Sequence, residues 1–257
     1  MSFTSDMAGE KDFTLSADAV QCAAILEKQC APAGISLSRA QLLQFARYYD
    51  LLTGTNKVMN LTALTSPQDV AVKHFIDSLL CYDAALMKGK TLIDVGTGAG
   101  FPGIPLKIYE PSMQVVLLDS LAKRLKFLQD AAEKLGLSAV RFEHKRAEDA
   151  GRDAHMRARY DVAVSRAVAR LSVLAEFCLP LVKKGGFFIA LKGSKYKEEI
   201  EEAERAISVL GGKLVSAREG KLPGTDEARA IIVIRKIKET PAVYPRKAGL
   251  PGKKPIR

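Results

Sequence analysis

The sequence predicts an α/β fold: a doubly wound, mostly parallel sheet with a helical part before it and a basic tail after it. Three observations support this prediction. From Thr91 onward, short apolar runs alternate with amphipathic segments, which is typical of a parallel sheet covered by helices. A glycine-rich turn directly follows the first apolar run. The 257 residues are 47% hydrophobic and 26% charged, which fits a globular protein of one or two domains.

The part of the chain before the first strand is predicted to be helical. One helix covers Ser16–Cys30. A second begins at Ser38, where a glutamine three residues on fits a capping box, and Gly54 suits its end. The loop Asn56–Thr62 then precedes a third helix near Gln68–Met87, whose apolar side chains recur at helical spacing.

Strands and helices alternate in the core that follows. The predicted strands are Thr91–Val95, Gln114–Leu118, Ala139–Glu143, Asp161–Val164 and Gly186–Leu191. The predicted helices are Gly103–Tyr109, Leu121–Leu135, Arg170–Val182 and Lys195–Leu210, and two last runs, Lys213–Ala217 and Ala230–Ile234, are expected to pair antiparallel. The expected organisation is a flexible N-terminus (1–15), N-terminal helices (16–88), a core (89–236) and a basic tail (237–257).

Composition and cysteine spacing exclude several classes of protein. The chain has no apolar run of about 18 residues and no secretory signal at its N-terminus, so a membrane span is not expected. The four cysteines, Cys22, Cys30, Cys81 and Cys178, form no C-x-x-C pair and no zinc pattern with histidine. We therefore expect reduced, mostly buried thiols, a cytoplasmic location and no metal site.

The net charge of +10 is concentrated at the C-terminus. Between Arg235 and Arg257 there are eight basic residues and one acidic residue, so the other 234 residues carry only +3. A basic tail indicates a polyanionic partner, most often nucleic acid, which makes Arg246 and Lys247 candidate RNA ligands. The alternative is a tail that only increases solubility.

The loop from Asp94 to Pro105 carries the clearest sign of a ligand site. Small residues, among them Gly96 and Gly98, let a ligand approach the backbone closely at the start of a helix. Asp119 ends the second strand, where a carboxylate can accept hydrogen bonds from ribose hydroxyls. Phe101 stands where the dinucleotide pattern needs glycine, so nicotinamide binding is disfavoured. The G-x-G-x-G spacing resembles the S-adenosylmethionine (SAM) loop of class I, Rossmann-like methyltransferases; a tight turn without a ligand is the other alternative.

Further polar residues follow the other predicted strands. Ala147 and Glu148 come after the third strand and can meet the adenine edge of a cofactor, although Glu148 can also be a solvated loop acid. Arg166 follows the fourth strand, nearest to a transferable methyl group; its alternative is a structural ion pair with Asp94 or Glu148. Lys192 ends the fifth strand and places another cation at this edge, which makes it a candidate RNA ligand.

Lys123 and Arg124 open the helix after Asp119, where they either contact phosphate or are solvated helix charges. Other signals are negative. No Asn-Pro-Pro-Tyr sequence follows the fourth strand, which argues against methylation of an exocyclic amino group. Cys178 lies inside a predicted helix and is expected in the core rather than as a nucleophile. We expect His74 to be a partly buried, hydrogen-bonded imidazole rather than a catalytic base.

Six motifs in order resemble the RsmG (GidB) family, from about Leu42 to Arg257. They are Asn56-Lys-Val-Met-Asn-Leu-Thr62, His74-Phe-Ile-Asp-Ser78, the Asp94–Pro105 loop, Leu117-Leu-Asp-Ser-Leu-Ala-Lys-Arg124, Val164-Ser-Arg-Ala167 and Tyr244-Pro-Arg-Lys-Ala-Gly249. The first and last are the most specific. The sequence departs from the family in its extension before Ser16 and in lacking the tryptophan that often precedes Asn56.

The resemblance implies a SAM-dependent enzyme that methylates N7 of a guanine in the 530 loop of 16S ribosomal RNA, in the small ribosomal subunit. It implies cofactor contacts at Gly96, Phe101, Ala147, Glu148 and Arg166, and catalytic or RNA-binding roles for Arg124 and Arg166. A monomer is expected. Guanine N7 carries a lone pair and no proton, so the reaction needs no general base. Two alternatives remain at this point: a class I methyltransferase with another substrate, and a non-catalytic RNA-binding or ribosome-assembly factor.

Overall fold

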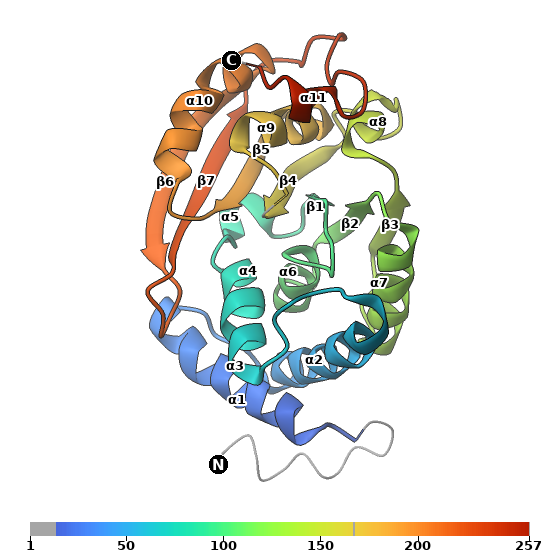
Figure 1. Cartoon of the computed structure of the whole chain (residues 1–257), viewed down its shortest axis with the longest axis vertical. Helices are drawn as coiled ribbons and strands as arrows, with labels where there is room; N and C mark the ends of the chain where they lie inside the picture. The colour runs from blue at the N-terminus through green and yellow to red at the C-terminus, as the bar shows by residue number, and fades with distance from the viewer. Residues whose placement is uncertain (1–13, 167, 257) are drawn as a thin grey trace.

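The fold is an open sheet with helices on both faces, as predicted. The computed structural model describes residues 14–166 and 168–256, so the predicted flexible N-terminus lies almost entirely outside the described part. Within it, the strands form one seven-stranded sheet in the order β3-β2-β1-β4-β5-β7-β6 (Figure 1). The strands are β1 (Thr91–Val95), β2 (Gln114–Asp119), β3 (Val140–His144), β4 (Tyr160–Arg166), β5 (Val182–Lys192), β6 (Gly212–Lys221) and β7 (Ala228–Lys236).

The first five strands are parallel, and β7 pairs antiparallel with both β5 and β6. The strand order reverses between β1 and β4, which are neighbours in the sheet. At such a point the connections leave in opposite directions, and a crevice opens at the carboxyl ends of the strands. The topology therefore places a ligand site beside the ends of β1, β2 and β4.

Two buried clusters of apolar side chains cover the two faces of the sheet. Successive side chains of a strand point to opposite faces, so Leu92 belongs to one cluster and Ile93 to the other. The first face packs against α1 (Ala17–Cys30), α2 (Arg39–Met59), α6 (Gly103–Tyr109) and α7 (Ala122–Lys134). The second packs against α8 (Ala147–Arg152), α9 (Leu171–Cys178) and α10 (Tyr196–Val209). The four cysteines are free and buried, as expected.

The second N-terminal helix is longer than predicted. Ser38 and Gln41 form the expected capping box, but the helix continues through Gly54 to Met59 and ends at Asn60 in the left-handed conformation. A glycine inside a helix costs only about 1 kcal/mol relative to alanine, and asparagine suits a left-handed cap. Most of the stretch Asn56–Thr62 that was predicted as a loop is therefore the last turn of α2.

The third predicted helix is shorter and irregular. It consists of α3 (Pro67–Asp69), a π-helical stretch (Val70–Ile76) and α4 (Asp77–Leu79). A separate helix, α5 (Ala84–Met87), follows, and Asp83 is its N-cap. Periodicity near 3.6 residues does not reveal a π-helical insertion. Such insertions are frequent at functional sites, and this one carries His74.

The predicted helix over Arg170–Val182 also ends early. The α-helix stops at Cys178, Leu179–Leu181 form a 3-10 turn, and Val182 already belongs to β5. Pro180 has no backbone N–H to donate and crowds the preceding turn, so the α-helix cannot continue through it.

The basic tail packs against the core. Its short helix α11 (Leu250–Lys253) lies beside α8 and α9 (Figure 1). Arg157 donates to the carbonyl oxygens of Thr240 (2.6 Å) and Tyr244 (2.8 Å), and the side chain of Arg246 pairs with Glu176 of α9 (2.6 Å). The predicted tail is therefore packed against the core through these contacts.

Candidate active site

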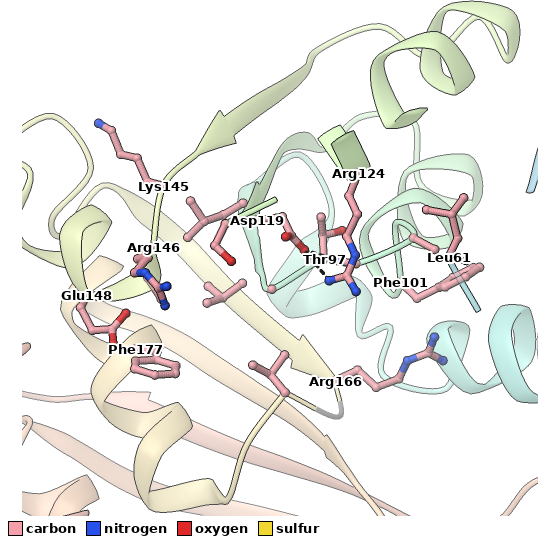
Figure 2. Close-up of a pocket in the computed structure, with 18 of the residues that line it drawn as sticks. Leu61, Thr97, Phe101, Asp119, Arg124, Lys145, Arg146, Glu148, Arg166 and Phe177 are labelled. Atoms are coloured by element: carbon pink, nitrogen blue, oxygen red, sulfur yellow. Dashed lines mark hydrogen bonds and ion pairs between the residues drawn. The ribbon is translucent and has the colours of Figure 1, made fainter. Parts of the chain in front are cut away.

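A cavity of about 600 Å³ opens at the carboxyl ends of β1, β2 and β4, where the topology predicts a ligand site (Figure 2). Its walls include the glycine loop after β1, the ends of β2 and β4, the turn between β3 and α8, and the tail. Its lining includes all of the predicted cofactor residues, namely Gly96, Gly98, Phe101, Asp119, Ala147, Glu148 and Arg166, and also Arg124.

The glycine loop is held by the end of β2. The N–H groups of Gly96 and Thr97 donate to the carbonyl oxygen of Leu118 (2.9 and 3.1 Å). Gly98 has a φ of +61°, and no atom stands within 4 Å of the position of a Cβ there. The loop thus presents bare backbone to open space in the cavity, which is what close approach of a ligand requires.

Asp119 connects this loop to the start of α7. One carboxylate oxygen accepts the N–H of Gly98 (2.9 Å), and the other accepts the N–H of Leu121 (2.9 Å). Arg124 lies 3.5 Å from the first oxygen and is partly exposed. Asp119 is therefore fixed at the edge of the cavity. Its Oδ2 accepts from both Gly98 and Arg124, whereas Oδ1 has a further lone pair for a ligand.

Asp94 lies beneath the loop and is completely buried. One oxygen accepts from Thr97 Oγ1 (2.7 Å) and from the N–H of Gly103 (2.8 Å). Its Oδ1 is buried without a hydrogen-bond partner among the described residues. Burial raises the pKa of Asp94 to about 6, because it disfavours the charged form.

Glu148 joins the cavity to the C-terminal tail. The residue lies in the first turn of α8 and is buried, so it is not the solvated loop acid that was considered. Its Oε1 accepts the N–H of Gly249 (2.8 Å), and Gly249 and Gly252 themselves line the cavity. The tail therefore forms one wall of the pocket, although the sequence predicted a core that is complete by about Lys236.

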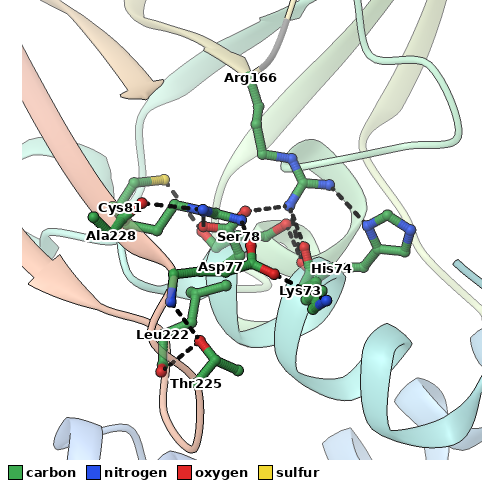
Figure 3. A network of polar contacts seen from close by, with 11 residues as sticks. Lys73, His74, Asp77, Ser78, Cys81, Arg166, Leu222, Thr225 and Ala228 are labelled. Atoms are coloured by element: carbon green, nitrogen blue, oxygen red, sulfur yellow. Dashed lines mark hydrogen bonds and ion pairs between the residues drawn. The ribbon is translucent and has the colours of Figure 1, made fainter. Parts of the chain in front are cut away.

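Arg166 is the centre of a polar network (Figure 3). Its Nη1 donates to Asp77 Oδ2 (3.0 Å) and to the carbonyl oxygens of Lys73 (3.1 Å) and His74 (3.3 Å). The guanidinium also lies over the ring of Phe101, 5.0 Å from its centroid. The alternative drawn from the sequence is an ion pair of Arg166 with Asp94 or Glu148. In the structure, the partner of Arg166 is Asp77.

His74 contacts both this arginine and the ring of Phe101. The two rings are stacked, with centroids 4.4 Å apart. Arg166 Nη2 lies 3.3 Å from His74 Nδ1, and Thr62 Oγ1 lies 2.8 Å from Nε2. Since Arg166 can only donate, Nδ1 is the acceptor and Nε2 carries the proton. Burial, and then the charge of Arg166, lower the pKa of His74 to about 3, which agrees with the expected uncharged imidazole.

Two of the cations proposed as RNA ligands have partners inside the protein. Lys192 is only 8% exposed and pairs with Glu199 (2.7 Å) and the carbonyl oxygen of Ala169 (2.7 Å). Arg246 pairs with Glu176, which is itself 1% exposed. In this conformation both side chains form ion pairs within the protein, which argues against the phosphate contacts predicted for them. Lys247 is exposed.

Comparison with known proteins decides the family. The family model described as rRNA small subunit methyltransferase G matches residues 41–228. A protein named ribosomal RNA small subunit methyltransferase G from Alkaliphilus metalliredigens (strain QYMF) is 51% identical over 234 residues, covering 91% of this chain and 98% of its own. A protein of the same name from Lactobacillus johnsonii is 51% identical over 235 residues, covering 90% and 98%.

This chain belongs to the rRNA small subunit methyltransferase G family. Solved structures support the fold alone. A SAM-dependent methyltransferase from Aquifex aeolicus matches with a TM-score of 0.50 and 17% identity, covering 68% of this chain and 96% of its own. A putative transferase from Pyrococcus horikoshii matches with a TM-score of 0.52 and 16% identity, covering 68% and 66%. The predicted class I methyltransferase fold is confirmed.

The cavity residues fit SAM, the cofactor of this fold class. The open backbone at Gly98 and the fixed carboxylate of Asp119 are polar positions that a nucleoside can use. No cluster of three or more His, Cys, Asp or Glu side chains suited to a metal occurs in residues 14–166 and 168–256. None of the helices in this part is long and apolar enough to cross a membrane.

Sequence reasoning missed three parts of the site. Asp77 and the tail glycine Gly249 lie in motifs that carried the family resemblance, and Gly252 follows the last of them, but nothing in their spacing predicted which residues they contact. Arg229 of β7 reaches Asp77 from the far end of the chain (3.1 Å). In the sequence, Arg229 is visible only as a charged residue next to a predicted buried strand. This position does not identify Asp77 as its partner.

Proposed function

We propose that this protein transfers a methyl group from SAM to N7 of a guanine in the 530 loop of 16S ribosomal RNA, in the small ribosomal subunit. The observation that carries the proposal is the cavity bounded by Gly98, Asp119 and Arg166, at the switch point of the sheet, in a chain of the rRNA small subunit methyltransferase G family. The guanine N7 and the 530 loop come from the family resemblance of the six motifs.

The polar groups of the cavity suit a reaction that needs no general base. His74 has both ring nitrogens engaged, with Arg166 and Thr62, and its lowered pKa keeps it uncharged at neutral pH. The oxygens of Asp119 each accept a backbone N–H. Guanine N7 presents a lone pair without a proton, so its attack requires alignment and exclusion of water more than proton transfer.

When it is bound, SAM supplies a methyl group activated by the positive charge of its sulfonium. The residues of the chain hold the reactants. Gly98 and Asp119 bind the nucleoside part of the cofactor, and Glu148 lies at the opposite wall (Figure 2). Arg166, fixed by Asp77 and Phe101, contacts O6 of the guanine or a flanking phosphate, since a donor placed on N7 would block the reaction.

Cations at the rim of the cavity suit a phosphate backbone. Arg124, Lys145 and Arg146 line the opening and are at least partly exposed. The tail adds exposed Lys247 and Lys253, which are close in sequence to the cavity residues Gly249 and Gly252. Phosphate contacts position an RNA without reading its sequence. The target base must leave its stack to reach the cavity, so a loop or splayed nucleotide is the expected substrate.

Incubation with labelled SAM and small ribosomal subunits that lack the modification tests the proposal. Label is expected on one guanine, and mapping by cleavage specific for 7-methylguanine should place it in the 530 loop. Free 16S rRNA in a parallel reaction shows whether the assembled particle is needed. Asp119→Ala should abolish most of the transfer. Label on protein, or on another atom or base, would contradict the proposal.

A further inference from the structure

A second cavity, of about 490 Å³, adjoins the first one at Arg166 and His74, which line both. Its other walls come from the end of β5, α10, the π-helical stretch and the start of β7. Leu64 and Leu191 give it apolar surface, and charged side chains supply the rest.

The charges in this second cavity are mixed. Four cations, Lys73, Arg166, Lys192 and Arg229, face three carboxylates, those of Asp77, Glu199 and Glu227. Phosphate is a poor occupant, because three carboxylates would lie close to it. A guanine base presents acceptors (O6 and N7) along one edge and donors (N1–H and the 2-amino group) along the other, so a mixed lining suits it.

Glu227 is the most exposed of the three carboxylates. Asp77 is 5% exposed, and its two oxygens pair with Arg166 and Arg229 (3.0 and 3.1 Å). The side chain of Glu199 is 15% exposed, and its Oε2 accepts from both Lys192 and the N–H of Leu171. Glu227 is 40% exposed; Lys73 lies 2.9 Å from one of its oxygens and Arg229 2.8 Å from the other.

These contacts hold Glu227 in place but leave part of its hydrogen-bond acceptor capacity free. Two cations hold its carboxylate in place, and the hydrogen bonds to Lys73 and Arg229 lower its pKa, so it is an ionised acceptor. Each carboxylate oxygen has a second lone pair. A fixed, ionised carboxylate can accept both N1–H and the 2-amino group of guanine at once, which adenine and the pyrimidines cannot match.

We infer that the second cavity receives the target guanine and that Glu227 is the residue that distinguishes it from other bases. This inference rests on the proposed function. The base enters with N7 toward the cofactor cavity, past Arg166 and His74, and with its N1–H and 2-amino group toward Glu227. The hairpin between β6 and β7 would then take part in base selection through the same network that fixes Arg166 (Figure 3).

Kinetics with inosine, which lacks the 2-amino group, provide the test. Subunits are reconstituted with guanosine or inosine at the methylated position, and single-turnover transfer is measured for the wild-type protein and for Glu227→Gln. The wild type should methylate inosine about tenfold more slowly or worse, the cost of one hydrogen bond to a charged group. Glu227→Gln should be slowed by a similar factor on guanosine and should show no further loss on inosine.

Asp226→Asn is the matched control. This neighbouring carboxylate pairs with Lys221 and does not line the cavity, so the variant should keep wild-type discrimination. Glu227→Asp is the second variant: it keeps the charge but withdraws the carboxylate by one methylene, and it should also lose discrimination. Calorimetric titration of SAM, expected to be unchanged in both Glu227 variants, shows that they are folded.

The outcomes are distinct. Full inosine discrimination in folded Glu227→Gln would overturn the inference and leave the proposed function standing. Tighter RNA binding by this variant with unchanged discrimination would mark the cavity as a phosphate site and would also overturn the inference. Absence of transfer to any guanine by the wild type would overturn the proposed function and this inference with it.

Discussion

Arg166 shows how one side chain serves both structure and reaction. Its two terminal nitrogens are shared among Asp77, two backbone carbonyls and His74, and the side chain is 12% exposed. Because a lysine has one ammonium group and no planar fork, it cannot reach these acceptors together. A conservative substitution therefore disturbs the position of the residue even though it keeps the charge.

We expect Arg166→Lys to lower single-turnover methylation per folded molecule by about tenfold or more, equivalent to about 1.4 kcal/mol or more. The melting temperature should also fall, since the buried pair with Asp77 is weakened. Arg170→Lys, at an exposed pair with Glu202, is the matched control and should change neither quantity. Normal activity per folded molecule in a destabilised Arg166→Lys would limit the residue to a structural role.

Asp119 should dominate the affinity for the cofactor. Asp119→Asn keeps the shape and one acceptor but loses the charge, so a charge-assisted hydrogen bond of about 1.5–3 kcal/mol is lost, or roughly ten- to a hundredfold in affinity. Calorimetric titration of SAM measures the effect. The exposed Asp130 of α7 provides the control variant, Asp130→Asn. Wild-type affinity in Asp119→Asn would contradict the assignment of this site.

His74 makes a testable contribution to the pH dependence of stability. Its pKa is about 3 when folded and about 6.5 when unfolded, so the unfolded chain binds more protons below pH 6.5. Stability from His74 is therefore complete above pH 6.5 and is lost as the pH falls toward 3, by up to about 1.4 kcal/mol per pH unit. The raised pKa of Asp94 acts in the opposite direction.

From pH 7 to pH 5, the free energy of unfolding of the wild type should fall by about 1–2 kcal/mol more than that of His74→Asn. Both proteins contain Asp94, so its contribution cancels in this comparison. Urea denaturation at each pH gives the values, and His155→Asn, at an exposed histidine, should behave like the wild type. Parallel pH profiles for wild type and His74→Asn would show that folding does not shift the pKa of His74.

Among the elements, those defined by alternation and capping were predicted well, and those defined by distant contacts were not. The five parallel strands and the capping box of α2 follow from local pattern. The π-helical stretch has no pattern of its own, and the docking of the tail depends on Arg157 and Glu176, which are remote in sequence. The main features of the cofactor loop were therefore predictable, but the wall formed by Gly249 was not.

The tail should affect both cofactor and RNA binding, through different residues. Deletion of residues 244–257 removes the N–H that Glu148 accepts and one wall of the cavity, so it should weaken SAM binding severalfold and lower the melting temperature. Combined substitution of Lys247, Lys253 and Lys254 by alanine should leave SAM binding unchanged. It should reduce the salt dependence of RNA binding by about 0.7–0.9 for each lost phosphate contact.

An unchanged SAM affinity in the deletion variant would mean that the tail wall is dispensable. An unchanged salt dependence in the triple variant would remove the proposed role of these three lysines in RNA binding. Calorimetry and filter binding over a range of salt concentrations distinguish the two results.

For the whole molecule, the predicted boundary between N-terminal helices and core does not separate two independent hydrophobic cores. Side chains of α1 and α2, among them Phe45 and Leu52, belong to the same buried cluster as Leu92 and Leu117 of the sheet. Composition and element order predicted the layers of the fold, but not that the helices complete one face of the sheet. Short helices with one apolar face only indicate that something must cover that face.

Residues 89–236 alone should therefore fail to fold cooperatively. This fragment would expose the face covered by α1 and α2 and would leave Arg166 and Arg229 without Asp77. Circular dichroism and calorimetry should show a broad or absent thermal transition and aggregation, whereas the full chain should melt in one step. A sharp transition for the fragment would establish it as an independent domain.

The hydrogen bond between Glu148 and Gly249 has a thermodynamic consequence. If docking of the tail strengthens cofactor binding by some factor, bound cofactor must strengthen docking of the tail by the same factor, because the two equilibria share one cycle. RNA that draws the tail lysines away from the core would then loosen the cofactor product, and RNA that leaves the tail docked would retain it. The order in which the two products leave would then depend on whether residues 244–257 bind the RNA product or stay docked against the core beside the cofactor product.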